Sequence, residues 1–217
     1  MDEFKIIPAV LAHNSNELRH QLSILTPLAN EIYIDYADGQ LVNGKTVNFQ
    51  ELLDIPRSYL ENKFSLHIMA QSPFVIANEA CDAGYTIITI QLEAIDENEL
   101  DMISELAMRA KVFLAIKPET GIEKLEPFLD CINGVTIMTI DPGAQGRGFQ
   151  GKALDKITSI NALGFDGEIE VDGSINQHTI TQAINAGAQR FVIGSALTKT
   201  KDPIKAYKQL LEKINNG

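Results

Sequence analysis

The sequence predicts an α/β protein, a single closed (β/α)8 barrel (TIM barrel) that spans residues 1–217. A chain of 217 residues that is 45% hydrophobic is long enough to bury one sizeable core. Short runs rich in Ile, Val and Thr alternate with segments of helical spacing, and this unit repeats every 22 to 33 residues. No Pro/Ser-rich or low-complexity linker divides the chain, so we expect one domain.

Eight runs have the length and the β-branched composition of buried strands. Eight such units in succession predict a parallel sheet that closes on itself. The runs are KIIPAVL (5–11), EIYIDYA (31–37), FSLHIMA (64–70), TIITIQL (86–92), KVFLAIK (111–117), GVTIMTI (134–140), GEIEVDG (167–173) and RFVIGSA (190–196).

The segments between these runs have apolar residues at helical spacing, and several end in Gly or Asn, as helices often do. The competing fold is a doubly wound open sheet. Its fingerprint G-x-G-x-x-G is missing after the first run, so we expect the barrel and no nucleotide cofactor. The predicted helices include NELRHQLSIL (16–25), SPFVIANEACDAG (72–84), ENELDMISELAMRA (97–110), IEKLEPFLD (122–130), NQHTITQAINAG (176–187) and DPIKAYKQLLEKI (202–214).

Charge and hydropathy exclude two classes of partner. The formal net charge of −11 opposes binding to a phosphate backbone, which depends on Lys and Arg, so we expect no nucleic-acid partner. No segment reaches the ~18 consecutive apolar residues that a spanning helix requires, and the N-terminus lacks the pattern of a secretory signal. We therefore expect a cytoplasmic protein with no membrane partner.

Polar side chains point to the mouth of the predicted barrel. Active sites of such barrels lie at the C-terminal ends of the strands, and side chains alternate along each strand. The alternation turns Tyr33, Asp35, His67, Met69 and Asp172 inward. Burying Asp35, His67 and Asp172 together is unfavourable unless they are paired, hydrogen-bonded or joined by a cation. The competing interpretation is a buried polar network without catalytic function.

Three glycine-containing loops follow the last three strands. Glycine permits close approach of the backbone, and N–H groups after strands seven and eight of a barrel, with a short following helix, form a phosphate site. A single glycine after a strand usually serves only to form a turn. Three such loops at one end of the barrel predict a phosphate site, and we expect a phosphorylated sugar as the ligand. The residues are Gly143, Gly146, Gly173, Ser174, Gly194 and Ser195.

Lys117 offers a second chemistry. It ends the fifth run in the inward phase with Phe113 and Ala115, where a lysine is able to form a Schiff base with a keto sugar phosphate, as in an aldolase. The simpler interpretation is a solvated lysine at the start of a loop.

Six segments, in order over nearly the whole chain, together resemble the ribulose-phosphate 3-epimerases. The resemblance implies a TIM barrel of the ribulose-phosphate-binding type and a cytoplasmic enzyme that inverts the carbon next to the carbonyl of a ketose phosphate, in that family a ketopentose 5-phosphate. It also implies a homo-oligomer. The residues themselves do not distinguish a pentose from a hexose phosphate. The segments are IPAVLA (7–12), IDYADGQLV (34–42), LHIM (66–69), MTIDPGAQGRGF (138–149), EVDGSIN (170–176) and AGAQRFVIGSA (186–196).

The resemblance also implies roles for individual residues. In that family two Asp and two His hold a divalent metal, commonly zinc, iron or manganese, and the same two Asp exchange the proton. Asp35, His67 and Asp172 match three of these positions, with Asp35 and Asp172 as the catalytic acids. Met69 and Met138 match the apolar wall beside the substrate, where His67 also lies.

Several positions depart from the family pattern, among them Asn43 and Gly44, which replace its Pro-Asn. Tyr33 stands where the family has the second metal-binding His, and a phenol with a pKa near ~10 must lose its proton to bind a metal well. Ala9, Ala37 and Gln91 replace the Ser, Met and His of the pattern. We expect Tyr33 to weaken or remove the metal. A barrel that binds a sugar phosphate but is catalytically impaired is therefore the alternative function.

Overall fold

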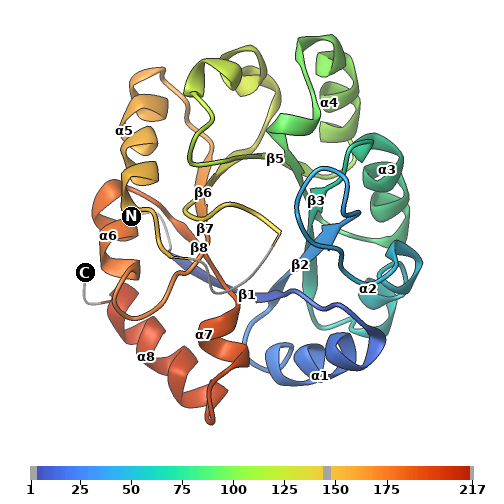
Figure 1. The fold of residues 1–217 in the computed structure, drawn as a ribbon, viewed down its shortest axis with the longest axis vertical. Coiled ribbons are helices and arrows are strands. Elements are labelled where there is room, and N and C mark those ends of the chain that lie inside the picture. The colour runs from blue at the N-terminus through green and yellow to red at the C-terminus, as the bar shows by residue number, and fades with distance from the viewer. Residues whose placement is uncertain (1–3, 144–147, 216–217) are drawn as a thin grey trace.

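The eight strands form a closed parallel barrel with the helices outside it (Figure 1). The computed structural model describes residues 4–143 and 148–215. Strands pair in sequence order and β8 closes on β1, which confirms the predicted fold class. Each observed strand lies within three residues of its predicted bounds. The strands are β1 (Lys5–Val10), β2 (Glu31–Ala37), β3 (Lys63–Met69), β4 (Ile87–Gln91), β5 (Lys111–Ile116), β6 (Gly134–Met138), β7 (Glu168–Asp172) and β8 (Arg190–Ile193).

The helices agree less closely with the prediction. Segment 122–130 forms two 3-10 helices, η4 (Ile122–Lys124) and η5 (Glu126–Cys131), where we expected an α-helix. Pro127 has no N–H to donate within this segment, and its ring disfavours a regular α-helix. The α-helices are α1 (Ser15–Leu25), α2 (Ile55–Ser58), α3 (Pro73–Ala83), α4 (Leu100–Ala107), α5 (Asp155–Ala162), α6 (Ile180–Ala186), α7 (Ser195–Thr198) and α8 (Pro203–Asn215).

Local polar contacts determine where helices begin. At α1 the side chain of Asn14 accepts hydrogen bonds from the N–H groups of Asn16 and Glu17, which would otherwise have no partner. Helix α6 begins four residues later than predicted because the preceding residues form a turn. There the Thr179 hydroxyl accepts from the Asn176 N–H and donates to the Ser174 carbonyl.

The buried apolar residues form a main core outside the barrel and a smaller cluster inside it. The main apolar core lies between the strands and the helices, whereas a smaller cluster of Ile7, Ala9, Tyr33 and Val192 fills the barrel itself. Above it, parallel register aligns Asp35 with His67. Polar groups are therefore concentrated at the C-terminal ends of the strands, as the alternation of side chains predicts.

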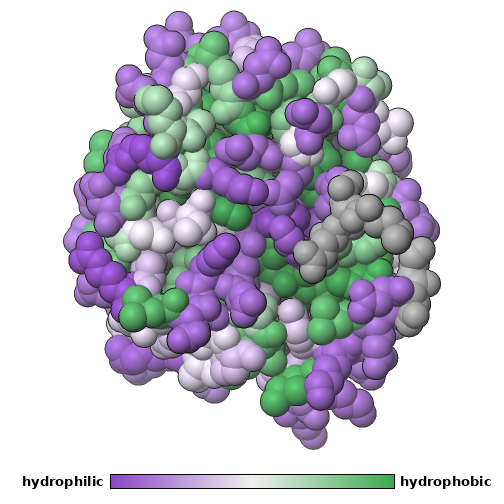
Figure 2. Space-filling view, turned by 180° about the vertical axis from the view of Figure 1, so that it is seen from behind, coloured by the Kyte–Doolittle hydropathy of each residue, from purple (hydrophilic) through white to green (hydrophobic). Residues whose placement is uncertain are grey.

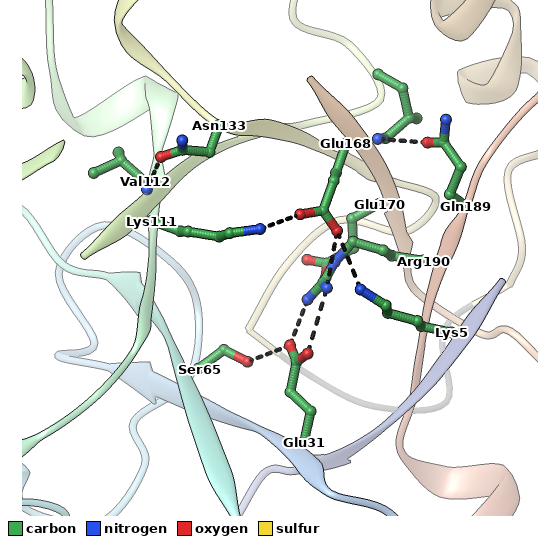
Figure 3. Close-up of polar contacts among 11 residues, drawn as sticks. Lys5, Glu31, Ser65, Lys111, Val112, Asn133, Glu168, Glu170, Gln189 and Arg190 are labelled. Atoms are coloured by element: carbon green, nitrogen blue, oxygen red, sulfur yellow. Dashed lines mark hydrogen bonds and ion pairs between the residues drawn. The ribbon is translucent and has the colours of Figure 1, made fainter. Parts of the chain in front are cut away.

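An ion cluster closes the opposite end of the barrel (Figure 3). Arg190 is 1% exposed, and its guanidinium group binds the carboxylates of Glu31, Glu168 and Glu170. Its Nε lies 3.0 Å from Glu170 Oε2, and its Cζ lies 5.1 Å from the centre of the Phe113 ring. These contacts satisfy the buried charge and fill the barrel at the end remote from the predicted site.

One face of the molecule is mainly polar (Figure 2). The side opposite to that of Figure 1 is largely hydrophilic, with smaller hydrophobic areas between the polar side chains (Figure 2). Within residues 4–143 and 148–215, no helix has the length and apolar character needed to cross a membrane.

Candidate active site

Two carboxylates and one imidazole converge at the mouth of the barrel. Asp35 lies on the inward face of β2 near its C-terminal end, His67 lies on β3 and Asp172 ends β7. One possible ligand atom from each lies within 4.8 Å of the others. The predicted meeting of Asp35 and Asp172 across the barrel is thus present in the structure.

His67 is fully buried and hydrogen-bonded on both ring nitrogens. Its Nδ1 lies 3.2 Å from Asp35 Oδ1, and its Nε2 lies 3.0 Å from Gln91 Oε1. Burial alone would lower the pKa of His67, but the hydrogen bond and negative charge of Asp35 outweigh it and raise that pKa above its ordinary value. The pair is therefore suited to hold positive charge between the imidazole and the carboxylate.

Asp172 has a strongly perturbed carboxyl group. It is partly exposed to the pocket, yet loss of solvent around its carboxylate and, next, the negative charge of Asp35 raise the pKa of Asp172 well above its usual range. Two neighbouring acids that resist simultaneous ionisation favour a state with one protonated and one charged. Such a state provides an acid and a base in one pocket.

Tyr33 lies one layer below the two acids and is fully buried. Burial and the negative charges of Glu170, Asp172 and Asp35 raise the pKa of Tyr33 well above that of an ordinary phenol. Its hydroxyl interacts with that of Thr89, but neither has a hydrogen bond of ordinary geometry in the described part of the chain. A neutral phenol is a poor metal ligand, so Tyr33 does not complete a four-residue set.

The remaining donors fit a divalent metal. One imidazole and two carboxylates suit zinc, iron or manganese, and a site with three protein ligands leaves a position open for substrate. The raised pKa of Asp172 means that a metal there would compete with a proton. The donor set is thus compatible with a metal but weaker than one with a second imidazole.

A pocket of about 500 Å3, including the open space at its mouth, lies above these groups. Both acids and all the other predicted binding residues except two line this pocket. His67 is fully buried and does not line it, and Gly146 lies outside the described residues. The predicted residues that line the pocket are Asp35, Met69, Met138, Gly143, Asp172, Gly173, Ser174, Gly194 and Ser195.

The sequence did not identify the apolar residues of this pocket as site residues, although Ala9 was noted as a departure from the family. They follow the ends of strands or occupy inward positions, but an apolar residue there has the same pattern as core packing. These are Ala9, Leu11, Ile140, Pro142, Ile175 and Val192.

The loop after β7 has a backbone that favours close approach of a ligand. Gly173 and Ser174 both have positive φ, 120° and 54°, and Ser174 is not a glycine. A Cβ on Gly173 would lie 2.7 Å from Ile140 Cγ1 and 2.9 Å from the Ile140 nitrogen. Strained backbone of this kind is frequent at ligand sites, which supports the prediction for this loop.

The loops after β2 and β6 meet beside the pocket. A Cβ on Gly44, whose φ is 140°, would lie 2.3 Å from the carbonyl oxygen of Gly143. Asp38, at the start of the first loop, accepts hydrogen bonds from the N–H groups of Gln40, Leu41 and Gln71. Burial would raise the pKa of Asp38, but these hydrogen bonds lower it overall, so Asp38 fixes the loop.

Lys117 does not line the pocket. Its backbone N–H donates to Glu93 Oε1 at 3.0 Å, and its carbonyl accepts from Lys156 Nζ at 2.6 Å. The residue is held at the start of the loop after β5, which agrees with the simpler interpretation of its position.

Comparison with known proteins gives a consistent result. The sequence profile of the ribulose-phosphate 3 epimerase family matches residues 5–198. A protein of Schizosaccharomyces pombe named ribulose-phosphate 3-epimerase is 27% identical over 94% of this chain and 90% of its own length. One of the same name from Mycobacterium bovis is 31% identical over the same shares.

A solved structure, KGPDC from Streptococcus mutans, superposes with a TM-score of 0.74. It covers 100% of this chain and 99% of its own, at 13% identity, and so supports the fold alone. The profile match spans all eight strands and the candidate site residues. The chain therefore belongs to the ribulose-phosphate 3-epimerase family.

Proposed function

We propose that this protein epimerises a ketose phosphate at the carbon next to its carbonyl, with Asp35 and Asp172 as the two proton-transfer groups. The observation that supports this most directly is the pair itself. Both acids line one pocket, and the pKa of Asp172 is raised by burial and by the charge of Asp35. The names and sequences of the relatives support the reaction class.

In the proposed reaction, ionised Asp35 removes the proton from the carbon next to the carbonyl. The C–H electron pair becomes the carbon–carbon double bond of an enediolate, and the carbonyl oxygen takes the negative charge. Protonated Asp172 then donates its proton to the opposite face of that carbon, and the carbonyl re-forms. Asp35 ends protonated and Asp172 ionised, so the reverse direction uses the same groups in exchanged roles.

His67 assists by its place beside Asp35. Its raised pKa favours a protonated ring next to the base, where positive charge stabilises negative charge on the substrate. A divalent metal held by Asp35, His67 and Asp172 would supply Lewis-acid stabilisation of the enediolate oxygen when bound. Met69 and Met138 line the pocket and limit water around the reacting carbon.

The phosphate of the substrate is proposed to bind the loops after β6, β7 and β8. Gly143, Gly173, Ser174, Gly194 and Ser195 all line the pocket. Backbone N–H groups at the last two loops are the usual phosphate site of a TIM barrel. This placement puts the sugar carbons over the two acids.

Deuterium exchange into ribulose 5-phosphate in D2O tests the proposal. Wild-type protein, assayed with and without added zinc or manganese, should incorporate solvent deuterium at one carbon. Asp35→Asn and Asp172→Asn should each abolish exchange, whereas Asp130→Asn, the same change at an exposed site, should not. Exchange that survives in either pocket variant contradicts the two-acid mechanism.

A catalytically impaired binder is the second candidate, and Tyr33 is the observation that favours it. Wild-type protein that binds the sugar phosphate in calorimetry but exchanges no deuterium on any ketose phosphate, with or without metal, would establish this function instead. The homo-oligomer, the single domain over residues 1–217 and the cytoplasmic location stay predictions.

A further inference from the structure

A chain of hydrogen bonds leads from His67 away from the pocket. Gln91, at the end of β4, has its Oε1 3.0 Å from His67 Nε2 and donates from Nε2 to Glu93 Oε2 at 2.5 Å. Gln91 is fully buried. Three side chains therefore form one line from the imidazole to a carboxylate behind it.

Glu93 is anchored independently of Gln91. Its Oε1 accepts hydrogen bonds from the Lys117 N–H, at 3.0 Å, and from the Thr120 hydroxyl. The ammonium group of Lys156 also interacts electrostatically with Glu93. The loop after β5 thus holds this carboxylate in place with its second oxygen directed at Gln91.

The fixed carboxylate determines the orientation of the Gln91 amide. An ionised carboxylate only accepts hydrogen bonds, so Gln91 must turn its NH2 group towards Glu93. The amide oxygen is then the atom that faces His67. Because an amide oxygen only accepts, the hydrogen on this contact must belong to His67 Nε2.

This assignment has a consequence on the other side of the ring. With its proton on Nε2, neutral His67 presents the Nδ1 lone pair to Asp35 Oδ1 at 3.2 Å. A lone pair and a carboxylate repel each other at that distance unless a proton or a metal cation lies between them. His67 Nδ1 and Asp35 Oδ1 are therefore placed to bind one proton or one metal cation between them.

We propose that Gln91 and Glu93 are positioning residues that hold His67 in the Nε2–H form, so that Nδ1 and Asp35 Oδ1 together bind a divalent cation or a proton. This inference rests on the proposed function for its catalytic meaning, but not for its geometry. Neither residue lines the pocket, so both act through His67. Hydrogen bonds behind a histidine ligand fix its tautomer and ring orientation in metal sites generally.

A charge-swapped double variant tests this directly. In the Gln91→Glu, Glu93→Gln double variant, the new carboxylate at position 91 accepts the hydrogen bond from His67 Nε2. The new amide at position 93 donates from its NH2 group to that carboxylate. Its oxygen accepts from the Lys117 N–H and the Thr120 hydroxyl, as Glu93 does in the wild type. Every hydrogen bond of the chain is retained. Gln91→Met removes the acceptor at similar size, and Glu93→Gln alone removes the constraint on the Gln91 amide.

The first readout is the 15N spectrum of the imidazole of His67, assigned by its loss in His67→Gln. Wild-type and double-swap proteins should show a proton on Nε2, with Nδ1 either bare, protonated or zinc-bound. At a pH at which the ring is neutral, Gln91→Met should show a mixture of tautomers. Neutral wild-type His67 with its proton on Nδ1, or a Gln91→Met spectrum identical to wild type, would overturn the proposal.

The second readout is zinc affinity measured by calorimetry on metal-free protein. Gln91→Met should weaken zinc binding by about 10- to 100-fold, and the double swap should recover it to within about threefold of wild type. Loss of affinity in the double swap equal to that of Gln91→Met would contradict positioning. If wild-type protein binds no zinc, the tautomer spectra alone decide the proposal.

The two proposals fail in different ways. Correct tautomers with no deuterium exchange would contradict the epimerase function and leave the positioning role in place. Deuterium exchange with a proton on Nδ1 of neutral His67 would do the reverse. Should Gln91→Met fail to fold, Glu93→Gln still tests the proposal, because a freed amide should give a mixed tautomer signal.

Discussion

Replacing Arg190 by methionine should strongly destabilise the protein, because it leaves a buried carboxylate without its cation. Glu170 is 1% exposed and, among the described residues, would keep a single side-chain hydrogen bond, from the Thr136 hydroxyl at 2.9 Å. Breaking a buried ion pair by removing one partner costs about 3–5 kcal/mol. The contact of the guanidinium with the Phe113 ring is lost as well.

The other two acids of the cluster should add little to this loss. The side chains of Glu31 and Glu168 are 19% and 27% exposed, and water screens charges at such positions. Lys5 and Lys111 also remain to pair with Glu168. We therefore expect Arg190→Met to lower the free energy of unfolding by about 3–5 kcal/mol, which corresponds to a fall in Tm of roughly 6–20 °C for a chain of this size.

Urea unfolding followed by circular dichroism measures this change. Arg190→Met with Glu170→Leu should recover most of the loss, because no unpaired buried charge then remains. Lys5→Met, at a half-exposed contact of 3.9 Å with Glu168, is the matched control and should change stability by less than ~0.5 kcal/mol. A loss below ~1 kcal/mol in Arg190→Met, or no recovery in the double variant, would refute the argument.

The same variant has a defined dependence on pH. Burial raises the pKa of Glu170 in the folded protein, and Arg190 opposes that rise, so its removal should raise the pKa further. A carboxyl group whose pKa is higher folded than unfolded favours folding at low pH, and this contribution is lost as pH rises through the folded pKa. The deficit of Arg190→Met should therefore shrink on acidification from pH 8 to pH 5.

Four further predictions concern the site. Tyr33→His should raise zinc or manganese affinity at least roughly tenfold by calorimetry, because it supplies a second imidazole; no gain would contradict this interpretation of the pocket. Tyr33→Phe should leave the free energy of unfolding unchanged or raise it by up to ~1 kcal/mol in urea, since the hydroxyl lacks a well-formed hydrogen bond among the described residues. Gly44→Ala should lower the free energy of unfolding by ~1–3 kcal/mol and raise the KM for a ketose phosphate, because the added Cβ would clash with the Gly143 carbonyl oxygen. Gly164→Ala is the control: Gly164 also has positive φ, but the space around it is open, so KM should not change. In metal-free protein, stability should fall as pH rises through the raised folded pKa of Asp172, and Asp172→Asn should remove this fall; an unchanged pH profile would show that Asp172 titrates normally.

Local pattern accounts for the success of the strand predictions. Runs such as EIYIDYA and KVFLAIK have β-branched and apolar residues in strand-length blocks, and the observed β2 and β5 nearly coincide with them. Helical spacing predicts helices less well where a proline, or a side chain that hydrogen-bonds to the backbone, favours another conformation. Pro127 converts the expected helix 122–130 into 3-10 turns, and the hydrogen bonds of Asn176 and Thr179 delay α6.

The alternation of side chains along a strand was enough to predict that Asp35, His67 and Asp172 point inward at one end of the barrel. It did not reveal the role of the residues behind them. The direction of the Gln91 amide depends on Glu93, whose own position depends on Lys117 and Thr120 from another loop. Such a chain is set by contacts between segments and has no spacing in the sequence to mark it.

The sequence by itself determined the succession of the strands and the face on which each side chain lies, because these follow from composition and from the period of two along a strand. The catalytic roles of Asp35 and Asp172 were implied by the family resemblance and stay predictions. The tertiary structure decided which charges meet and how strongly each is desolvated. Arg190 pairs with Glu31 across 159 residues, and Asp172 owes its raised pKa to burial and to Asp35. Closure of the barrel sets these distances, and both Coulomb energy and solvation depend on distance and depth rather than on position in the chain.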